Sequence, residues 1–411
     1  MAAAASWTED VMESLQLNLG VDPVCRLPEE LMAKILSRVD LQSLWRCLQV
    51  SRAWNTVAMS NPVWLAQFQS RRKWKAKQQR VEGLNWKKMF TTRHQLDVHW
   101  KQGQAKTMML NGHTESVYCL QFDDEKIVTG SRDRTVRVWS TKTGELLKTL
   151  EENQPSNGEK IGGHLGSVLC LIYDNHLMVS GSSDTTCIVW SLPEFKATHR
   201  LRHHTSRVLD CTMNDRFIVS CSKDGTIGIL DKKVADYPLL RIIQACQGSL
   251  NAIHMQRNLI ASAGVDRVVR LWHAETGKGL TSFHGHTRGL ACVQISPDMR
   301  IVVSGGNDNT IRVWDVWHRQ CVRVFTAHQG LVRSLHINGH KLISGSYDKT
   351  IKVWDLDSLT LTMDLDQFHS AWILTAKTNG KMIVSSSFGP TPVVLDFTTG
   401  LDPRYMNLIE Y

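Results

Sequence analysis

Residues 127–139 read IVTGSRDRTVRVW, and this segment decides the fold of the chain. Two short runs, 127–131 and 135–139, are rich in β-branched residues and flank the polar turn 132–134. Such runs, bounded by turn-forming residues, are typical of adjacent β-strands. The fold therefore depends on whether the same pattern recurs elsewhere in the chain.

The pattern recurs with a period of about 40 residues. A histidine position is repeated, with one cysteine, at His113, His164, His204, Cys246, His286, His328 and His369. An aspartate follows at Asp133, Asp184, Asp224, Asp266, Asp308 and Asp348. Six residues after each aspartate come Trp139, Trp190, Leu230, Trp272, Trp314 and Trp354. The chain therefore contains a repeated unit of about four short strands.

A four-stranded sheet of this size cannot bury both of its faces alone, whereas sheets stacked radially in a closed ring can. Residues 106–110 precede the first unit and resemble 146–150, which precede the second. We expect them to form an unpaired outer strand that joins the last unit (372–397) and closes a seven-bladed ring.

These repeats resemble the WD-repeat family from about residue 103 to 411. The family markers are Gly-His at 112–113, 163–164 and 285–286, and Trp-Asp at 314–315 and 354–355. The resemblance implies a buried hydrogen-bond network within each blade, formed in blade one by His113, Asp133, Thr129 and Trp139. Repetition of the His/Asp pairs favours this structural role over catalysis or metal binding. Blades that depart from the pattern should depend more on packing; the departures are Leu230, Cys246, Gly389 and Leu395.

Residues 23–68 have helical spacing instead, with Leu27, Leu31, Ile35 and Val39 four residues apart. Asp40 and Ser51 are expected to cap further helices, and a fourth helix begins near 61–62. Trp54 and Val57 suit either a contact with a partner protein or an internal core.

This stretch resembles the F-box, through LPEEL at 27–31, Ile35-Leu36, Val39-Asp40, Leu44, VSRAW at 50–54 and Trp64. The resemblance implies docking onto the Skp adaptor, and through it onto a cullin and a RING subunit. The residues expected to contact the adaptor are Leu27, Pro28, Leu31, Ile35 and Leu36. The alternative is a helical cap that packs only on the propeller.

Residues 69–102 are expected to form a stiff, basic helical connector that sets the distance of the substrate. Its cations are Arg71, Arg72, Lys73, Lys75, Lys77, Arg80, Lys87 and Lys88. They fit a solvated helix face, with a nuclear address or nucleic-acid contact as alternatives. Residues 1–22 are expected to form an amino-terminal tail.

In the resembled family, partners usually bind the propeller face that carries the loops just before each Gly-His and between the middle strands, and the residue before each repeated aspartate is expected on this face. The residues expected to bind substrate here are Arg132, Lys223, Arg333, Tyr118, Tyr347 and Asn307. The three cations suit a phosphorylated peptide, and the aromatic and polar residues suit an unphosphorylated one. A polar insertion at 151–160 should overhang this face, either as part of the site or as a tolerated loop.

Composition limits the function classes. The 411 residues carry a net charge of +9, and the ten cysteines include no CxxC pair, which argues against a zinc site or a disulfide scaffold. No signal peptide and no apolar run of ~18 residues is evident. We therefore expect a soluble protein, cytoplasmic or nuclear, with no cofactor and no membrane partner.

The combined expectation is a multidomain chain: an all-α F-box module (23–68), the linker (69–102) and an all-β seven-bladed WD-repeat propeller (103–411). It predicts a non-catalytic substrate-recognition subunit of an SCF-type ubiquitin ligase. The alternative is a WD-repeat scaffold without a ligase role, with or without nucleic acid.

Overall fold

The computed structural model describes residues 22–71, 74–77, 83–151 and 162–410. The chain divides into two compact units. The helical unit comprises residues 1–102 and 398–411, and the propeller unit comprises residues 103–397. Each unit is described by itself below.

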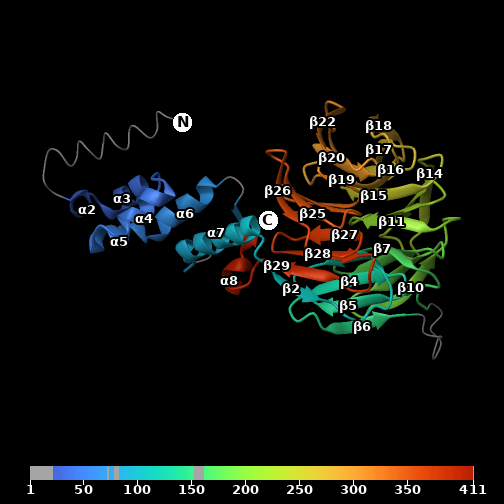
Figure 1. The fold of residues 1–411 in the computed structure, drawn as a ribbon, viewed down its shortest axis with the longest axis horizontal. Coiled ribbons are helices and arrows are strands. Elements are labelled where there is room, and N and C mark those ends of the chain that lie inside the picture. Colours follow the sequence, from blue (N-terminus) through green and yellow to red (C-terminus); the bar gives the residue numbers. More distant parts are fainter. Residues whose placement is uncertain (1–21, 72–73, 78–82, 152–161, 411) are drawn as a thin grey trace. The chain divides into compact units, whose positions relative to one another are not determined.

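The helical unit is built from short helices and one longer one (Figure 1). Their bounds are α2 (Pro23–Arg26), α3 (Glu29–Leu36), α4 (Leu41–Cys47), α5 (Arg52–Ala58), α6 (Asn61–Ser70), α7 (Trp86–Gln102) and α8 (Pro403–Met406). The predicted caps are confirmed, because the Asp40 carboxylate accepts from Ser43 N at 3.0 Å and the Ser51 hydroxyl accepts from Trp54 N at 3.3 Å. Among the described helices, none combines the length and the apolar character needed to cross a bilayer.

The core of the helical unit continues past residue 68 into the predicted connector. Trp86, Met89 and Phe90 of α7 are buried. The Phe90 ring packs edge-on against Trp64 of α6, with the ring centres 5.2 Å apart. A helical module of some 45 residues has little core of its own, so α7 supplies a large part of the apolar surface that stabilises it. The segment predicted as a spacer is, from Trp86 onward, part of this core.

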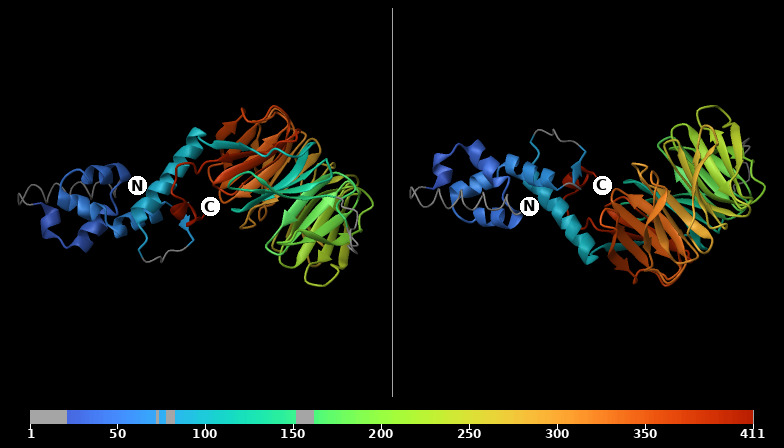
Figure 2. Two further views of the ribbon diagram at one scale, coloured as in Figure 1. Left: turned by 90° about the horizontal axis from the view of Figure 1, so that it is seen from below. Right: turned by 90° about the horizontal axis from the view of Figure 1, so that it is seen from above.

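The last residues of the chain also belong to the helical unit. β1 (Lys75–Ala76) pairs antiparallel with β30 (Ile409–Glu410), and α8 contacts α7, beside which it lies in Figure 2. The sequence had placed the end of the propeller at 411, whereas the propeller unit ends at Phe397. The reason is topological: β2 supplies the fourth strand of the last sheet, so residues after Phe397 have no place in the ring.

The propeller unit contains, within the described residues, seven four-stranded antiparallel sheets, numbered here as blades one to seven (Figures 1 and 2). Blades one and two are β3 (Val117–Phe122), β4 (Lys126–Ser131), β5 (Val136–Ser140), β6 (Leu146–Leu150), and β7 (Val168–Tyr173), β8 (Leu177–Ser182), β9 (Cys187–Ser191), β10 (Lys196–Leu201). Blades three and four are β11 (Val208–Met213), β12 (Phe217–Ser222), β13 (Thr226–Asp231), β14 (Leu239–Gln244), and β15 (Leu250–Gln256), β16 (Leu259–Gly264), β17 (Val269–His273), β18 (Gly279–Phe283). Blades five and six are β19 (Leu290–Ile295), β20 (Ile301–Gly306), β21 (Ile311–Asp315), β22 (Gln320–Phe325), and β23 (Val332–Asn338), β24 (Lys341–Ser346), β25 (Ile351–Asp355), β26 (Thr360–Leu365). Blade seven combines β27 (Ile373–Thr378), β28 (Met382–Ser387) and β29 (Val393–Asp396) with β2 (Lys106–Met109).

The predicted closure of the ring is confirmed. β2 pairs antiparallel with β29 from Lys106↔Asp396 to Met109↔Val393. Blades seven and one are further joined by the Ser386 hydroxyl, which donates to Val117 O at 2.8 Å. The strand that begins the ring is therefore held by the blade that ends it.

The hydrogen-bond network that the resemblance implied is present in blade one. His113 Nδ1 lies 2.7 Å from an Asp133 carboxylate oxygen, and His113 Nε2 lies 2.8 Å from Thr129 Oγ1. The Trp139 indole N–H donates to the same hydroxyl oxygen at 2.8 Å. With the ring proton on Nδ1, each of these buried polar groups has a partner, so the network fixes the turn without leaving an unpaired group.

The same four-member network recurs in blades two, five and six. It consists there of His164, Asp184, Ser180 and Trp190; of His286, Asp308, Ser304 and Trp314; and of His328, Asp348, Ser344 and Trp354. Burial opposes ionisation of these aspartates, but hydrogen bonds from their histidine and threonine neighbours outweigh it, and the pKa of each aspartate lies below its ordinary value.

In blade three, a second histidine takes the place of the tryptophan in the network, and sequence analysis did not identify it. Leu230 is buried where the indole would be, and His203 Nε2 instead lies 2.7 Å from Ser220 Oγ. Gly228 makes room for that ring, since a Cβ there would stand 2.5 Å from His203 Cδ2. In blade four Trp272 still donates to Ser262 at 2.8 Å, and in blade seven His369 still bonds Ser385 at 2.7 Å.

Side chains in the first strands also link neighbouring blades around the central channel, which those strands line. Gln121 of blade one accepts from Tyr173 N of blade two at 3.0 Å through its side-chain oxygen. The two equivalent histidines act through Nδ1: His254 accepts from Ile295 N at 3.1 Å, and His336 accepts from Thr378 N at 3.3 Å. A ring nitrogen can accept only while it is unprotonated, so these two links require neutral histidines.

Replacing Asp133 by alanine is expected to lower the free energy of unfolding of the propeller by about 3 kcal/mol, because the donors of His113, Thr114 and Thr135 lose their acceptor. Calorimetry on the full chain measures this. Arg132→Ala in the same turn is the control and should cost less than about 1 kcal/mol, as expected for an exposed ion pair. Equal losses in the two variants would contradict a structural network.

The double change His254→Gln/His336→Gln is expected to reduce the acid sensitivity of the propeller. Burial, with Lys377 nearby, lowers the pKa of His254 to about 4 and that of His336 to about 3. The unfolded chain binds these protons more readily, so stability falls as pH drops below about 6.5, by on the order of 3 kcal/mol per histidine at pH 4. Glutamine, as at Gln121, accepts the same bond without titrating.

Thermal unfolding of this variant and the wild type between pH 7.5 and 4 provides the test. The two should agree at pH 7.5 and diverge below 6.5, with the variant losing less. Buried Asp210 acts in the opposite sense in both proteins, since burial raises its pKa to about 6. Parallel curves would show that neither histidine contributes to the acid response.

Candidate protein-binding surfaces

The turns that carry the repeated aspartates lie at one end of the ring, and we call this the turn face. It consists of the turns at 132–134, 183–185, 223–225, 265–267, 307–309 and 347–349 with the loop at 388–390. Because neighbouring strands are antiparallel, the loops that lead into each first strand lie on the same face. The turns between first and second strands, and between third and fourth, lie on the opposite face.

Two of the predicted substrate residues, Tyr118 and Arg333, line the central channel, a cavity of about 450 Å³. Arg333 Nη1 donates to Ala291 O at 3.3 Å. Two further charged side chains, Asp210 and Lys377, line the same channel. Burial raises the pKa of Asp210 to about 6 and lowers that of Lys377, and the attraction between these groups moderates both shifts. Sequence reasoning did not identify either residue.

Arg132 lies on the turn face between blades one and two, where the surface is hollowed by about 660 Å³. Its Nε lies 3.1 Å from a Glu115 carboxylate oxygen, so its charge is already paired. Lys223 and Asn307 are exposed on the turns of blades three and five. The three predicted cations therefore lie on blades one, three and six, and two of them have protein partners.

The turn face carries a group of aromatic side chains at blades six and seven. Tyr347 stacks on Trp372 with ring centres 4.8 Å apart and an interplanar angle of 8°. Trp372 also contacts Phe388, at 5.8 Å. Trp372 is 48% exposed and Phe388 is 46% exposed, so this aromatic platform faces solvent. Large exposed aromatic surfaces of this kind are typical of protein-binding sites.

Trp372 was missed in the sequence, although a signal was present. It lies three residues after His369, and the same position holds Ser116, Ser167 and Ser249 in blades one, two and four. An indole at a position that tolerates serine is not required by the blade.

In the helical unit, α3 separates into two faces. Met32, Ala33 and Leu36 are buried, whereas Pro28 is exposed, Leu31 is 45% exposed and Ile35 and Leu27 are partly exposed. Leu36 was predicted to contact the adaptor, but it is 1% exposed and belongs to the core. Because an α-helix has about 3.6 residues per turn, residues spaced four apart, such as Leu31 and Ile35, rotate gradually around the helix axis. The spacing alone therefore did not separate the buried face of α3 from its exposed face.

Other exposed apolar side chains of the helical unit were not identified from the sequence. These are Trp45, Val50 and Met59. Trp54 and Val57, in contrast, are buried as expected for a core. The apolar surface of this unit is thus broader than α3 alone.

Some of the basic residues take part in packing. The Lys87 ammonium lies 5.3 Å from the centre of the Trp45 ring, and the Arg71 guanidinium lies 5.8 Å from that of Trp74. Burial lowers the pKa of Lys87. Arg72, Lys73 and Arg80 lie outside the described residues, as does the insertion 151–160 after Glu151. Over the described part of the chain, no group of three or more His, Cys, Asp or Glu side chains is placed to hold a metal ion.

Comparison with protein families agrees with both units. The F-box-like family matches residues 24–70, and the WD domain, G-beta repeat family matches 104–140, 156–191, 195–231, 277–315 and 319–355. Blades four and seven are the unmatched ones, and they are the blades that lack the histidine or the aspartate and tryptophan.

Individual relatives are similar over part of their length. A probable E3 ubiquitin ligase complex SCF subunit sconB from Arthroderma otae is 32% identical in an alignment that covers 32% of this chain and 24% of the relative. Cell division control protein 4 from Saccharomyces cerevisiae is 25% identical over 73% of this chain and 42% of its own length. Autophagy-related protein 16 from Arabidopsis thaliana is 26% identical over 47% of this chain and 37% of its own. The chain thus spans between about a quarter and two fifths of the length of these relatives.

Proposed function

Because the chain belongs to the F-box/WD-repeat family, we propose that it is the substrate-recognition subunit of an SCF-type ubiquitin ligase. Its helical unit docks the Skp adaptor, and its propeller binds the protein to be ubiquitinated. The observation that supports the proposal is that one chain carries two exposed apolar surfaces: the outer face of α3 and the aromatic platform on the turn face.

The adaptor site in this proposal centres on Leu31, with Pro28, Ile35 and Leu27 around it. Leu31 exposes apolar surface that α3 does not bury within its own unit. A partner that covers such a side chain removes it from water, which favours association. Trp45 in α4, Val50 before α5 and Met59 after α5 are further exposed apolar side chains that a partner could cover.

The chain contributes binding and no chemistry of its own in this proposal. A cysteine that carries a thioester needs an accessible thiolate. Cys119, Cys170 and Cys187 are buried, and burial raises the pKa of each thiol, whereas Cys321 is exposed on β22. Transfer of ubiquitin would then be the work of the enzymes that the cullin and RING subunits bring.

The substrate segment that fits best is an unphosphorylated one with an aromatic or apolar side chain. Arg132 is already paired with Glu115, and Arg132, Lys223 and Arg333 lie on three different blades, so they do not form one cluster of positive charge for a phosphate. The platform of Tyr347, Trp372 and Phe388 offers stacking surface instead.

The double change Pro28→Ala/Leu31→Asp is expected to weaken binding to the Skp adaptor by at least about a hundredfold, because a carboxylate would be buried in an apolar contact. Co-purification in high salt, followed by calorimetric titration, measures this. Leu147→Asp, at a 60% exposed leucine of β6, is the matched control and should bind normally. Failure of the wild-type chain to bind a folded adaptor would refute the ligase proposal.

Trp372→Ala is expected to remove most substrate proteins while the propeller stays folded, since about half of the Trp372 surface is exposed to solvent. The substrates can be trapped on the Leu31→Asp chain, which binds them without delivering them for ubiquitination. Quantitative mass spectrometry compares that chain with Leu31→Asp/Trp372→Ala and with the control Leu31→Asp/Leu147→Ala. Retention of the same proteins without Trp372, or their loss on phosphatase treatment, would contradict the proposed site or substrate class.

A further inference from the structure

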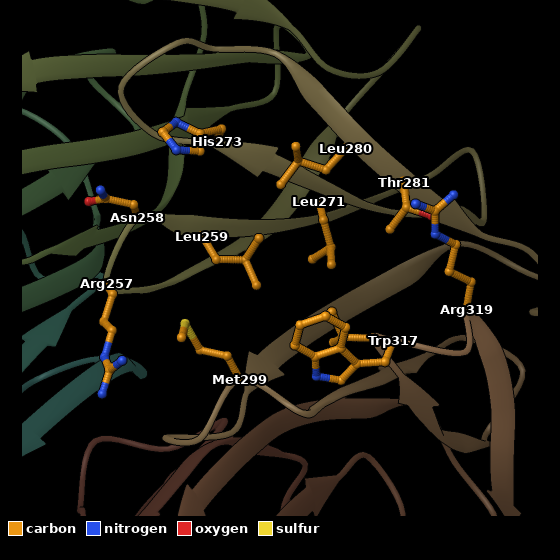
Figure 3. A pocket seen from close by; sticks show the side chains of 11 residues that line it. Arg257, Asn258, Leu259, Leu271, His273, Leu280, Thr281, Met299, Trp317 and Arg319 are labelled. Atoms are coloured by element: carbon orange, nitrogen blue, oxygen red, sulfur yellow. The ribbon is translucent and has the colours of Figure 1, made fainter.

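A second pocket lies on the opposite face of the propeller, between blades four and five (Figure 3). Its volume is about 590 Å³, within the range of known ligand-binding clefts. Strand ends and turns of the two blades line it: the β15–β16 turn and the start of β18 from blade four, and the β19–β20 and β21–β22 turns from blade five. It is therefore remote from the aromatic platform, which lies on the turn face.

The lining is mostly apolar and is held in place by the core. Leu259, Met299 and Val316 are partly buried and pack against the apolar cluster shared by blades four and five. Trp317 completes the lining but is 80% exposed. The turn that carries it is fixed by Asp315, which accepts from His318 N at 2.7 Å and lies 3.0 Å from the His318 ring. The pocket is thus preformed, and its largest aromatic ring has little packing of its own.

The blade itself does not require this tryptophan. Trp317 lies three residues after the blade tryptophan, and the same position holds Lys142 in blade one, Glu275 in blade four and Asp357 in blade six. The turn therefore forms with charged residues there. An exposed indole above an apolar pocket is the arrangement expected where a partner's side chain is to be covered.

The charges of the pocket have one sign. Arg257 and Arg319 are exposed at opposite sides, with Met299 and Trp317 between them (Figure 3). None of the lining residues carries a carboxylate. Three acidic residues in or next to the lining turns, Glu275, Asp298 and Asp315, already pair with Arg216, Arg300 and His318. An occupant with negative charge on both sides of an apolar centre would therefore complement this pocket.

We propose that this pocket docks a segment of a partner protein in which one bulky apolar side chain is flanked on both sides by acidic residues. The apolar side chain would lie against Leu259, Met299 and the Trp317 ring. The flanking carboxylates would pair with the Arg257 and Arg319 guanidinium groups, which suit bidentate recognition. The site does not depend on the proposed ligase role, and on the opposite face it leaves the turn face accessible to a substrate.

The test uses a phage-displayed library of random dodecapeptides selected on the immobilised full-length chain. Selection is repeated on Trp317→Ala/Arg319→Glu and on the matched control Leu147→Ala/Lys142→Glu, which removes one exposed apolar side chain and reverses one exposed charge in blade one. Peptides enriched by the wild type and the control, but not by the pocket variant, are then synthesised with a fluorescent label and titrated.

These peptides are expected to share an apolar residue between acidic ones, and to bind at least about tenfold more weakly to Trp317→Ala, to Arg257→Glu and to Arg319→Glu than to the wild type. Added salt should weaken binding further. The proposal is overturned if no peptides depend on the pocket residues, or if those that do are neutral or basic. Circular dichroism of each variant confirms that the propeller is folded.

Discussion

Seven four-stranded sheets can bury both of their faces only when the ring they form is closed, and here closure is a matter of backbone pairing. The first strand after the helical unit, β2, completes the sheet made by the last three, so the two ends of the propeller sequence share one blade. The central channel, the two faces and the order of the blades follow from that single pairing. Because β2 completes the last blade, the ring ends at Phe397, and residues 398–411 belong to the helical unit.

Once the ring is closed, individual blades can depart from the repeat without being lost. Blade three exchanges an indole for His203, and blade four loses its histidine altogether, yet both retain four paired strands. Neighbouring blades supply the missing constraint through packing and through links such as that from Ile295 N to His254. Positions that the ring does not need can then carry exposed aromatic side chains, as Trp372 and Trp317 do on the two faces.

The helical unit differs from the propeller, because its core is small and leaves several apolar side chains exposed. α7 contributes Trp86, Met89 and Phe90 to that core, and α8 contacts α7 from the far end of the chain. Even with this support, Leu31, Trp45 and Val50 remain exposed. A unit that buries part of its apolar residues and exposes the rest is suited to a stable complex with another protein.

The sequence by itself determined the architecture, because strand and helix periodicities, turn residues and a 40-residue repeat can all be recognised in the linear order of residues. It located the closing strand, the helix caps and the seven histidine positions, and it placed Tyr118 and Arg333 at equivalent points of their units. Tertiary structure decided which of these residues are available. The burial of Leu36 beside exposed Leu31, the pairing of Arg132 with Glu115, the stacking of Tyr347 on Trp372 and the return of residues 398–411 all depend on contacts between distant segments. Such contacts are set by the directions of side chains in the folded chain, and a one-dimensional pattern does not encode those directions.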